Sequence, residues 1–367
     1  MRATDVRGVR APLVAWYRVA ARDLPWRRTK DPYAIWVSEA MLQQTTVAAV
    51  IPYWERFLAR YPTLRSLAAS RGEDVLAVWS GLGYYRRARY LREGAIAVMH
   101  RHRGRVPKSI DALMDLPGVG RYTAGAIASV AFGLPAPVVD GNVKRVFSRL
   151  FALGGRSKRV PDNTYWSIAE SLVEGTAPGD WNQAVMELGA TVCTPRDPDC
   201  DRCPVARHCR ALARDHVARF PAPDKRVEVR VVPVAVSWIT RGNRVLLERR
   251  APDGPFRGSW DLPAAVIPKG VKAGRAIARQ FSKRHGITVQ SRQTLLKAKH
   301  SILAMRLRID VIDAAPRSAI PRRVALRWVE LDRLGEVAIS GATAKIARAV
   351  RAREAGDVAR RIASGVA

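Results

Sequence analysis

The chain has 367 residues, and its 63 lysines and arginines against 32 aspartates and glutamates give a formal net charge of +31. This length predicts two or three domains, and the charge favours a polyanionic partner, most simply nucleic acid, although an arginine-rich coding bias would also raise it. The longest apolar stretch, 124–139, is too short and interrupted to cross a bilayer. No signal segment is apparent at the N-terminus. We therefore expect a cytoplasmic protein without a membrane partner.

The first predicted domain covers residues 1–212 and is all-α. Apolar residues recur at helical spacing from about residue 5 onward, with few strand-like alternations. Glycine and proline signals separate the predicted helices, at Asp31-Pro32, Tyr61-Pro62, Gly81-Leu82-Gly83, Val106-Pro107, Pro117-Gly118 and Leu134-Pro135. The pattern indicates many short helices joined by tight turns.

A glycine-rich turn, Leu116-Pro117-Gly118-Val119-Gly120, lies between two predicted helices, 109–115 and 121–131. Two glycines around one small residue let the backbone N–H groups approach an anion, and the positive end of the next helix points to the same place. Such a helix-hairpin-helix would hold a DNA phosphate regardless of sequence, with an affinity that falls as salt rises. A plain turn between helices explains the same residues, so the motif alone does not decide its function.

All four cysteines lie within residues 193–209, with six, two and five residues between them. Cys193, Cys200, Cys203 and Cys209 suit an iron–sulfur centre, because each thiolate supplies one bond and the short loops limit the entropy cost of bringing them together. Structural zinc is the alternative, but zinc sites usually have two Cys-x2-4-Cys knuckles, and only Cys200 and Cys203 form one here. The spacing therefore favours a [4Fe–4S] cluster as the cofactor.

The pattern changes after Cys209. We predict a linker over residues 213–228, an α+β domain over 229–350, and a helical tail over 351–367. These boundaries depend on signals for strands at 229–239, 244–248 and 303–311 and for a helix at 342–363.

Several strings accompany the hairpin and the cysteines: Pro25-Trp26-Arg27, residues 36–45, residues 81–85, and Val139-Asp140-Gly141-Asn142-Val143. From about residue 10 to 212 the chain resembles the helix-hairpin-helix DNA glycosylases with an iron–sulfur cluster, and within them the MutY-type adenine DNA glycosylases. The resemblance implies an all-α glycosylase core with a [4Fe–4S] cluster loop at 193–209, followed by a Nudix-like α+β domain. It also implies a monomeric, nucleoid-associated, monofunctional repair enzyme. Such an enzyme flips adenine mispaired with 8-oxoguanine or guanine out of double-stranded DNA and hydrolyses its N-glycosidic bond.

Two carboxylates are the candidate catalytic groups, because glycosidic cleavage needs a proton for the leaving base and stabilisation of the cationic sugar. Glu39 lies in an apolar helical run, where partial burial would raise its pKa; an exposed helix glutamate is the plain alternative. Asp140 precedes a helical pattern and would also serve as its N-cap. The resemblance implies that Glu39 protonates adenine N7 and later helps to activate water, while Asp140 stabilises the oxocarbenium-like sugar.

Further roles follow from the resemblance. Gln44 and Tyr84 match residues that enter the duplex where the adenine leaves, and Leu82 matches a minor-groove probe; core packing is the alternative for Tyr84 and Leu82. Tyr122 stands where bifunctional relatives have a Schiff-base lysine, which implies little lyase activity. The residues expected at the DNA or the substrate are Arg27, Gln44, Leu82, Tyr84, Gly118, Gly120 and Tyr122.

The Nudix-like domain departs from its family in two places. The acidic residues that hold the metal in Nudix hydrolases are replaced by Val271, Gln280, Lys283 and Arg284, so no metal-dependent pyrophosphatase is expected. The resemblance also implies a Phe-Ser-His loop that senses the oxidised base, but His300-Ser301 is followed by Ile302-Leu303-Ala304. The second departure argues against a strong preference for 8-oxoguanine.

Two other functions fit parts of the sequence. A mismatch glycosylase for thymine or uracil opposite guanine would share the helical core, although the Nudix-like domain favours adenine. A non-catalytic DNA-binding or redox-sensing iron–sulfur protein would share the scaffold, but the presence of both Glu39 and Asp140 argues against it.

Overall fold

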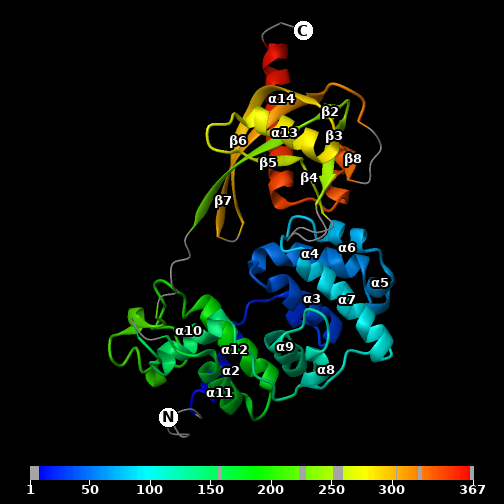
Figure 1. Ribbon diagram of the computed structural model, residues 1–367. Coiled ribbons are helices and arrows are strands. Elements are labelled where there is room, and N and C mark those ends of the chain that lie inside the picture. Colours follow the sequence, from blue (N-terminus) through cyan, green and yellow to red (C-terminus); the bar gives the residue numbers. More distant parts are fainter. Residues whose placement is uncertain are drawn as a thin grey trace. The chain divides into compact units, whose positions relative to one another are not determined.

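The computed structural model describes residues 8–155, 159–222, 229–250, 259–302, 304–320 and 325–363, with side chains described as far as residue 355. The chain divides into two compact units, Met1–Ala69 with Tyr90–Lys225 and Ser70–Arg89 with Arg226–Ala367. Part of the predicted linker (223–228), the predicted strand residue Leu303 and the end of the predicted tail (364–367) lie outside the described residues. Figure 1 labels most of the helices and strands of both units.

In its described part, the first unit has helices as its only regular elements, as the spacing of apolar residues predicts. They are α2 (Arg10–Ala20), η1 (Pro25–Arg27), α3 (Pro32–Leu42), α4 (Val47–Arg60), α5 (Leu64–Ala69), most of α7 (Arg86–Arg101), α8 (Ile110–Met114), α9 (Arg121–Phe132), α10 (Gly141–Leu150), α11 (Asp162–Val173), α12 (Pro178–Thr191), η2 (Ala206–His208) and η3 (Val217–Arg219). Across the described residues, no helix is both long and apolar enough to pass through a bilayer.

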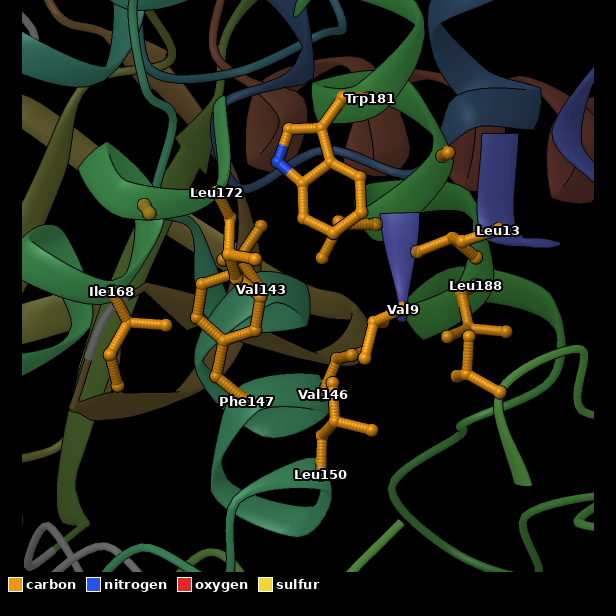
Figure 2. Close-up of a cluster of buried hydrophobic side chains, with 14 of the residues drawn as sticks. Val9, Leu13, Val143, Val146, Phe147, Leu150, Ile168, Leu172, Trp181 and Leu188 are labelled. Carbon is orange, nitrogen blue, oxygen red and sulfur yellow. The ribbon is translucent and has the colours of Figure 1, made fainter. Parts of the chain in front are cut away.

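One core of this unit gathers apolar side chains from α2, α10, α11 and α12. Figure 2 shows Phe147 of α10, Trp181 of α12 and Leu13 of α2 among the side chains of this cluster. Helix α10 contributes because its apolar residues recur on one stripe, at positions 143, 146, 147 and 150. Burial of that stripe fixes the start of α10, where Asp140 lies.

Helix α3 is buried on every side from Tyr33 to Met41. Its start is defined by Pro32 in the first turn and by the Asp31 carboxylate, which accepts a hydrogen bond of 3.0 Å from the Tyr33 amide. A helix that is apolar all round is stable only inside a protein, and α3 packs between α4 and α9. Any polar side chain on α3 therefore leaves water when the domain folds.

The second unit contains the predicted α+β domain together with helix α6 (Gly72–Val78). Its strands are β1 (Arg230–Trp238), β2 (Thr240–Arg241), β3 (Arg244–Arg249), β4 (Trp260–Asp261), β5 (Ala264–Val266), β6 (Val289–Ile302), β7 (Met305–Pro316) and β8 (Leu326–Glu330). Its remaining elements are α13 (Ala273–His285), η4 (Leu331–Glu336) and α14 (Gly341–Ala363).

The strands form two sheets. The first has the order β5-β1-β7-β6, in which β1 and β7 are parallel and the other pairs antiparallel. The second has β3 paired with β2, β4 and β8. Alternate residues of β1 point to opposite faces: Ala235 packs in a core with Phe281 of α13, and Val236 in a core with Ile346 of α14. Helices α13 and α14 therefore cover different cores of the domain.

Candidate active site

Five of the predicted site residues line one cavity of about 530 Å³ in the first unit: Arg27, Glu39, Gln44, Tyr122 and Asp140. They come from η1, α3, the turn after α3, the first turn of α9, and the residue before α10. Elements far apart in sequence thus bring two carboxyl groups, a phenol and a guanidinium to the same cavity. Its lining is both polar and apolar, as is usual for pockets that hold a small molecule.

Burial gives Glu39 an unusual proton affinity. The residue is 8% exposed, and its Oε2 atom is buried with no hydrogen-bond partner in the described part of the chain. Burial raises the pKa of Glu39 to about 7, and the negative charge of Asp140 adds to the rise, while the Tyr122 hydroxyl and the Arg27 charge act against it. The expected partial burial is confirmed, and at neutral pH this carboxyl group can both give and take a proton.

Asp140 is the N-cap of α10, as predicted. Its Oδ1 accepts a hydrogen bond of 2.7 Å from the Val143 amide, and its Oδ2 accepts one of 2.8 Å from the Asn142 side-chain amide. Burial raises the pKa of Asp140, and these two hydrogen bonds act in the opposite direction. The bonds hold the carboxylate in one orientation at the edge of the cavity.

A chain of hydrogen bonds leads from Asp140 to the cysteine segment. The Arg145 guanidinium donates through Nη2 to Asn142 Oδ1 at 2.8 Å and through Nε to the Cys193 carbonyl at 2.8 Å. The sequence analysis missed Asn142 and Arg145 as site residues. Their spacing after Asp140 on one helix was the available signal.

A buried ion cluster also lines the cavity, and the sequence analysis missed its anion, Glu187 of α12. The Glu187 side chain is fully buried and accepts hydrogen bonds from Arg22 Nε at 2.7 Å and from Arg27 Nη2 at 2.8 Å. Burial alone would raise the pKa of Glu187, but the bonds from Arg22 and Arg27 outweigh it and lower the pKa to about 2. Arg27 is therefore held in place by a permanent negative charge. A lone glutamate in the apolar run of α12 was the signal.

Tyr122 interacts with both carboxyl groups of the cavity. Burial, with the negative charges of Glu39 and Asp140, raises the pKa of the Tyr122 phenol well above its usual range. The hydroxyl therefore stays neutral and can donate a hydrogen bond; it also lies 3.3 Å from the Met186 sulfur. No lysine stands at this position.

The predicted hairpin lies between α8 and α9, outside the lining of the cavity. Gly118 has a φ of +77°, and a Cβ atom added there would lie 2.5 Å from Tyr90 Cβ. Gly120 is the N-cap of α9 with a φ of −97° and open space around it. Only the first glycine is thus required by backbone and packing.

The remaining two predicted DNA-contact residues, Leu82 and Tyr84, belong to the second unit. Leu82 is buried, which fits the packing alternative, whereas Tyr84 is 43% exposed. Tyr84 and Gln44 share one backbone feature: both have left-handed conformations, with φ of 50° and 58°. Such conformations are uncommon for residues other than glycine and concentrate at functional sites.

The four cysteines are free thiols that line one small cavity, together with Arg149. Arg149 is buried and donates to Cys193 Sγ at 3.3 Å, and backbone N–H groups of Val205, Ala211 and Leu212 donate to Cys203 and Cys209. Burial and the neighbouring thiols raise the pKa of Cys203 to about 11. Among the described residues, no group of three or more His, Cys, Asp or Glu side chains is placed to hold a metal ion. By donor chemistry, four thiols with N–H donors nearby are the kind of set that an iron–sulfur cluster uses.

Two family models match separate parts of the chain. Residues 37–170 match the family model of the HhH-GPD superfamily base excision DNA repair proteins, and residues 234–349 match that of the NUDIX domain. The predicted fold class, a helical helix-hairpin-helix glycosylase core followed by a Nudix-like α+β domain, is confirmed.

Individual relatives with the same assignment cover between about two thirds and nearly all of this chain. The adenine DNA glycosylase of Mus musculus is 36% identical over an alignment 403 positions long, which covers 94% of this chain and 78% of the mouse protein. The adenine DNA glycosylase of Mycolicibacterium smegmatis is 39% identical and covers 64% of this chain and 83% of its own. Among solved structures, a thermostable thymine-DNA glycosylase is similar, with a TM-score of 0.53 and 32% identity over 57% of this chain and 98% of that one.

Proposed function

The chain belongs to the adenine DNA glycosylase family, and from that premise we propose that it hydrolyses the N-glycosidic bond of adenine mispaired with 8-oxoguanine or guanine in double-stranded DNA. The single observation that carries the proposal is the pair Glu39 and Asp140 on one cavity, with the pKa of Glu39 raised to about 7. A group with that pKa suits proton transfer near neutral pH.

Glu39 gives its proton to adenine N7, so that the base leaves as a neutral molecule when the bond to C1′ breaks. The positive charge that develops on the sugar faces the Asp140 carboxylate, which Val143 and Asn142 hold in place. The Glu39 carboxylate then takes a proton from the water that attacks C1′, and the acid is restored. The products are free adenine and an abasic site.

Two neighbours of Glu39, Arg27 and Tyr122, have their own roles in the proposed reaction. Arg27, fixed by Glu187, presents a positive charge to the cavity. Tyr122 supplies a neutral hydroxyl and, unlike a lysine amine, forms no Schiff base with an abasic sugar. The enzyme is accordingly monofunctional.

DNA binding uses a different set of groups. The Gly118–Gly120 amides and the N-terminus of α9 hold a phosphate, and the net charge of +31 provides the general attraction. Gln44 and Tyr84 enter the stack as the adenine leaves. One protein molecule carries the complete set of proposed groups, so we expect it to act as a monomer at the nucleoid.

The four cysteines would hold a [4Fe–4S] cluster, with Arg149 and the backbone N–H donors around the sulfur atoms. When bound, the cluster would supply a structural tie for the 193–209 loop and, in principle, a redox centre. Base hydrolysis needs no electron, so the catalytic steps do not depend on its redox chemistry.

The test is identification of the base that is released. Duplexes carrying A opposite 8-oxoguanine, A opposite G, A opposite T and T opposite G are incubated with excess protein, and free bases are separated chromatographically. We expect adenine from the first two duplexes. Thymine from the T opposite G duplex, with no adenine from any, would instead support the activity named for the structurally similar thymine-DNA glycosylase.

A further inference from the structure

The loop between α6 and α7, residues 79–85, carries one exposed aromatic ring in a strained conformation. Tyr84 is 43% exposed with a φ of 50°, and the residues on both sides of it are fixed. The Trp79 indole donates to the Gly83 carbonyl at 3.0 Å, and Arg87 Nη2 donates to the same oxygen at 3.2 Å. Since the left-handed conformation is unfavourable for a tyrosine backbone, the contacts around it must hold it there.

A second set of contacts joins this loop to the C-terminal domain, within the same compact unit. Tyr85 is 1% exposed, and its hydroxyl donates to the Ile339 carbonyl. The Ser80 hydroxyl donates to the same carbonyl at 3.2 Å. On the flank of the loop, Glu73 of α6 pairs with Arg249 of β3 at 3.2 Å.

Ile339 is a rigid partner for the loop. It is 3% exposed in the core that also holds Trp260, and it forms a parallel bridge with Trp260. The next residue, Ser340, donates its amide to Asp261 Oδ1 at 3.1 Å. Because the backbone is fixed on both sides of the Ile339 carbonyl, that oxygen can act as a fixed point for the residues bound to it.

We propose that the Ile339 carbonyl of the C-terminal domain anchors the 79–85 loop, and that Tyr85 is a positioning residue that sets the depth to which Tyr84 enters the duplex. This rests on the proposed function, in which Tyr84 occupies space left by the extruded adenine. The C-terminal domain then acts on base extrusion through one hydrogen-bonded oxygen, without contributing a catalytic group.

The test measures extrusion apart from chemistry. All proteins carry Glu39→Gln, and in the duplex 2-aminopurine replaces the target adenine. The fluorescence of 2-aminopurine rises when that base leaves the stack. Tyr85→Phe removes only the hydroxyl that reaches Ile339. We expect the fluorescence rise to fall about fivefold, the scale of one neutral hydrogen bond, with DNA affinity changed less than about twofold. Ser80→Ala should give a smaller loss in the same direction.

Tyr33→Phe is the matched control, because Tyr33 is also buried and donates to a backbone carbonyl, that of Tyr61, at 2.8 Å in the first unit. It should lower thermal stability as Tyr85→Phe does while leaving the fluorescence rise intact. Equal extrusion by Tyr85→Phe and the reference, equal losses in both Phe variants, or no rise in the reference would each overturn the proposal. Adenine release by the otherwise wild-type protein is measured in parallel, so a failure of the proposed function is seen separately.

Discussion

Burial raises the pKa of Glu39 to about 7, and the negative charge of Asp140, which lines the same cavity, adds to that rise. Glu39 belongs to α3 and Asp140 caps α10, and the two carboxyl groups have different surroundings. Glu39 has one buried oxygen without a hydrogen-bond partner in the described part of the chain, whereas both oxygens of Asp140 accept hydrogen bonds. Such a pair separates the roles of proton donor and charge stabiliser.

The rate of adenine release should depend on the protonation of Glu39. Above pH 7 the protonated fraction of a group with a pKa of about 7 falls tenfold for each pH unit. Single-turnover rates on the A opposite 8-oxoguanine duplex should therefore be highest below pH 7 and decline steeply above it. A rate that stays constant from pH 6 to about pH 9 would exclude Glu39 as the proton donor.

The stability of the first unit should also depend on the protonation of Glu39. Because the folded-state pKa of Glu39 lies above the unfolded value of 4.5, the native state binds this proton more tightly. Its stabilising contribution is complete below pH 4.5 and is lost as the pH rises through 7, by about 3 kcal/mol in total. Glu39→Gln should match wild type near pH 4.5 and be the more stable protein at pH 8, as measured by calorimetric melting.

Glu187→Gln is the matched control for that experiment, and its effect on stability at pH 8 should have the opposite sign. The pKa of Glu187 is lowered to about 2 by Arg22 and Arg27, so its contribution is present above the unfolded pKa and lost as the pH falls toward 2. This variant should melt at a lower temperature than wild type at pH 8, because its free energy of unfolding should fall by about 3 kcal/mol or more. A shift of the same sign in both variants would contradict the assignment of the two pKa values.

The two hairpin glycines should respond differently to alanine. Gly118→Ala adds a Cβ atom 2.5 Å from Tyr90 Cβ at a φ of +77°, so it should lose about 1–3 kcal/mol of stability and bind a non-specific duplex more weakly. Gly120→Ala fits without strain and keeps its amide, so both properties should stay near wild type. Thermal melting and fluorescence anisotropy measure the two effects. Equal binding by both variants would argue against phosphate contact at the hairpin.

The cysteine cavity should hold iron and sulfide in equal amounts, four of each per chain. Cys203→Ser should lose the visible absorbance of the cluster and leave the 193–209 loop sensitive to protease, because the loop would lose its tie. Metal analysis of the wild-type protein gives the decisive reading. A colourless protein with one zinc would show that the thiols hold a single ion instead.

The sequence reveals those features of the site that local chemistry determines. The boundaries of α8 and α9 around the hairpin, the burial of Glu39 and the capping role of Asp140 all follow from neighbours within a few residues. Each depends on glycine, a cap or helical periodicity, which act over one or two turns.

The features that sequence reasoning missed depend on long-range contacts. Glu187 meets Arg22 across 165 positions of the chain, and Tyr85 meets Ile339 across 254. The lone glutamate in α12 signals a buried anion, but the sequence does not show which group it pairs with, because any of many arginines or carbonyls would satisfy the same donor or acceptor. The grouping of residues 70–89 with the C-terminal domain has the same origin: it follows from tertiary contacts that no periodicity encodes.

The most direct test compares wild type and Glu39→Gln in single-turnover adenine release from a duplex with A opposite 8-oxoguanine. We predict release by wild type and a loss of at least about a hundredfold in the variant, with DNA affinity retained. Release at comparable rates by both proteins, or no adenine from the wild type with its cluster intact, would contradict the assignment of Glu39 as the acid of an adenine glycosylase.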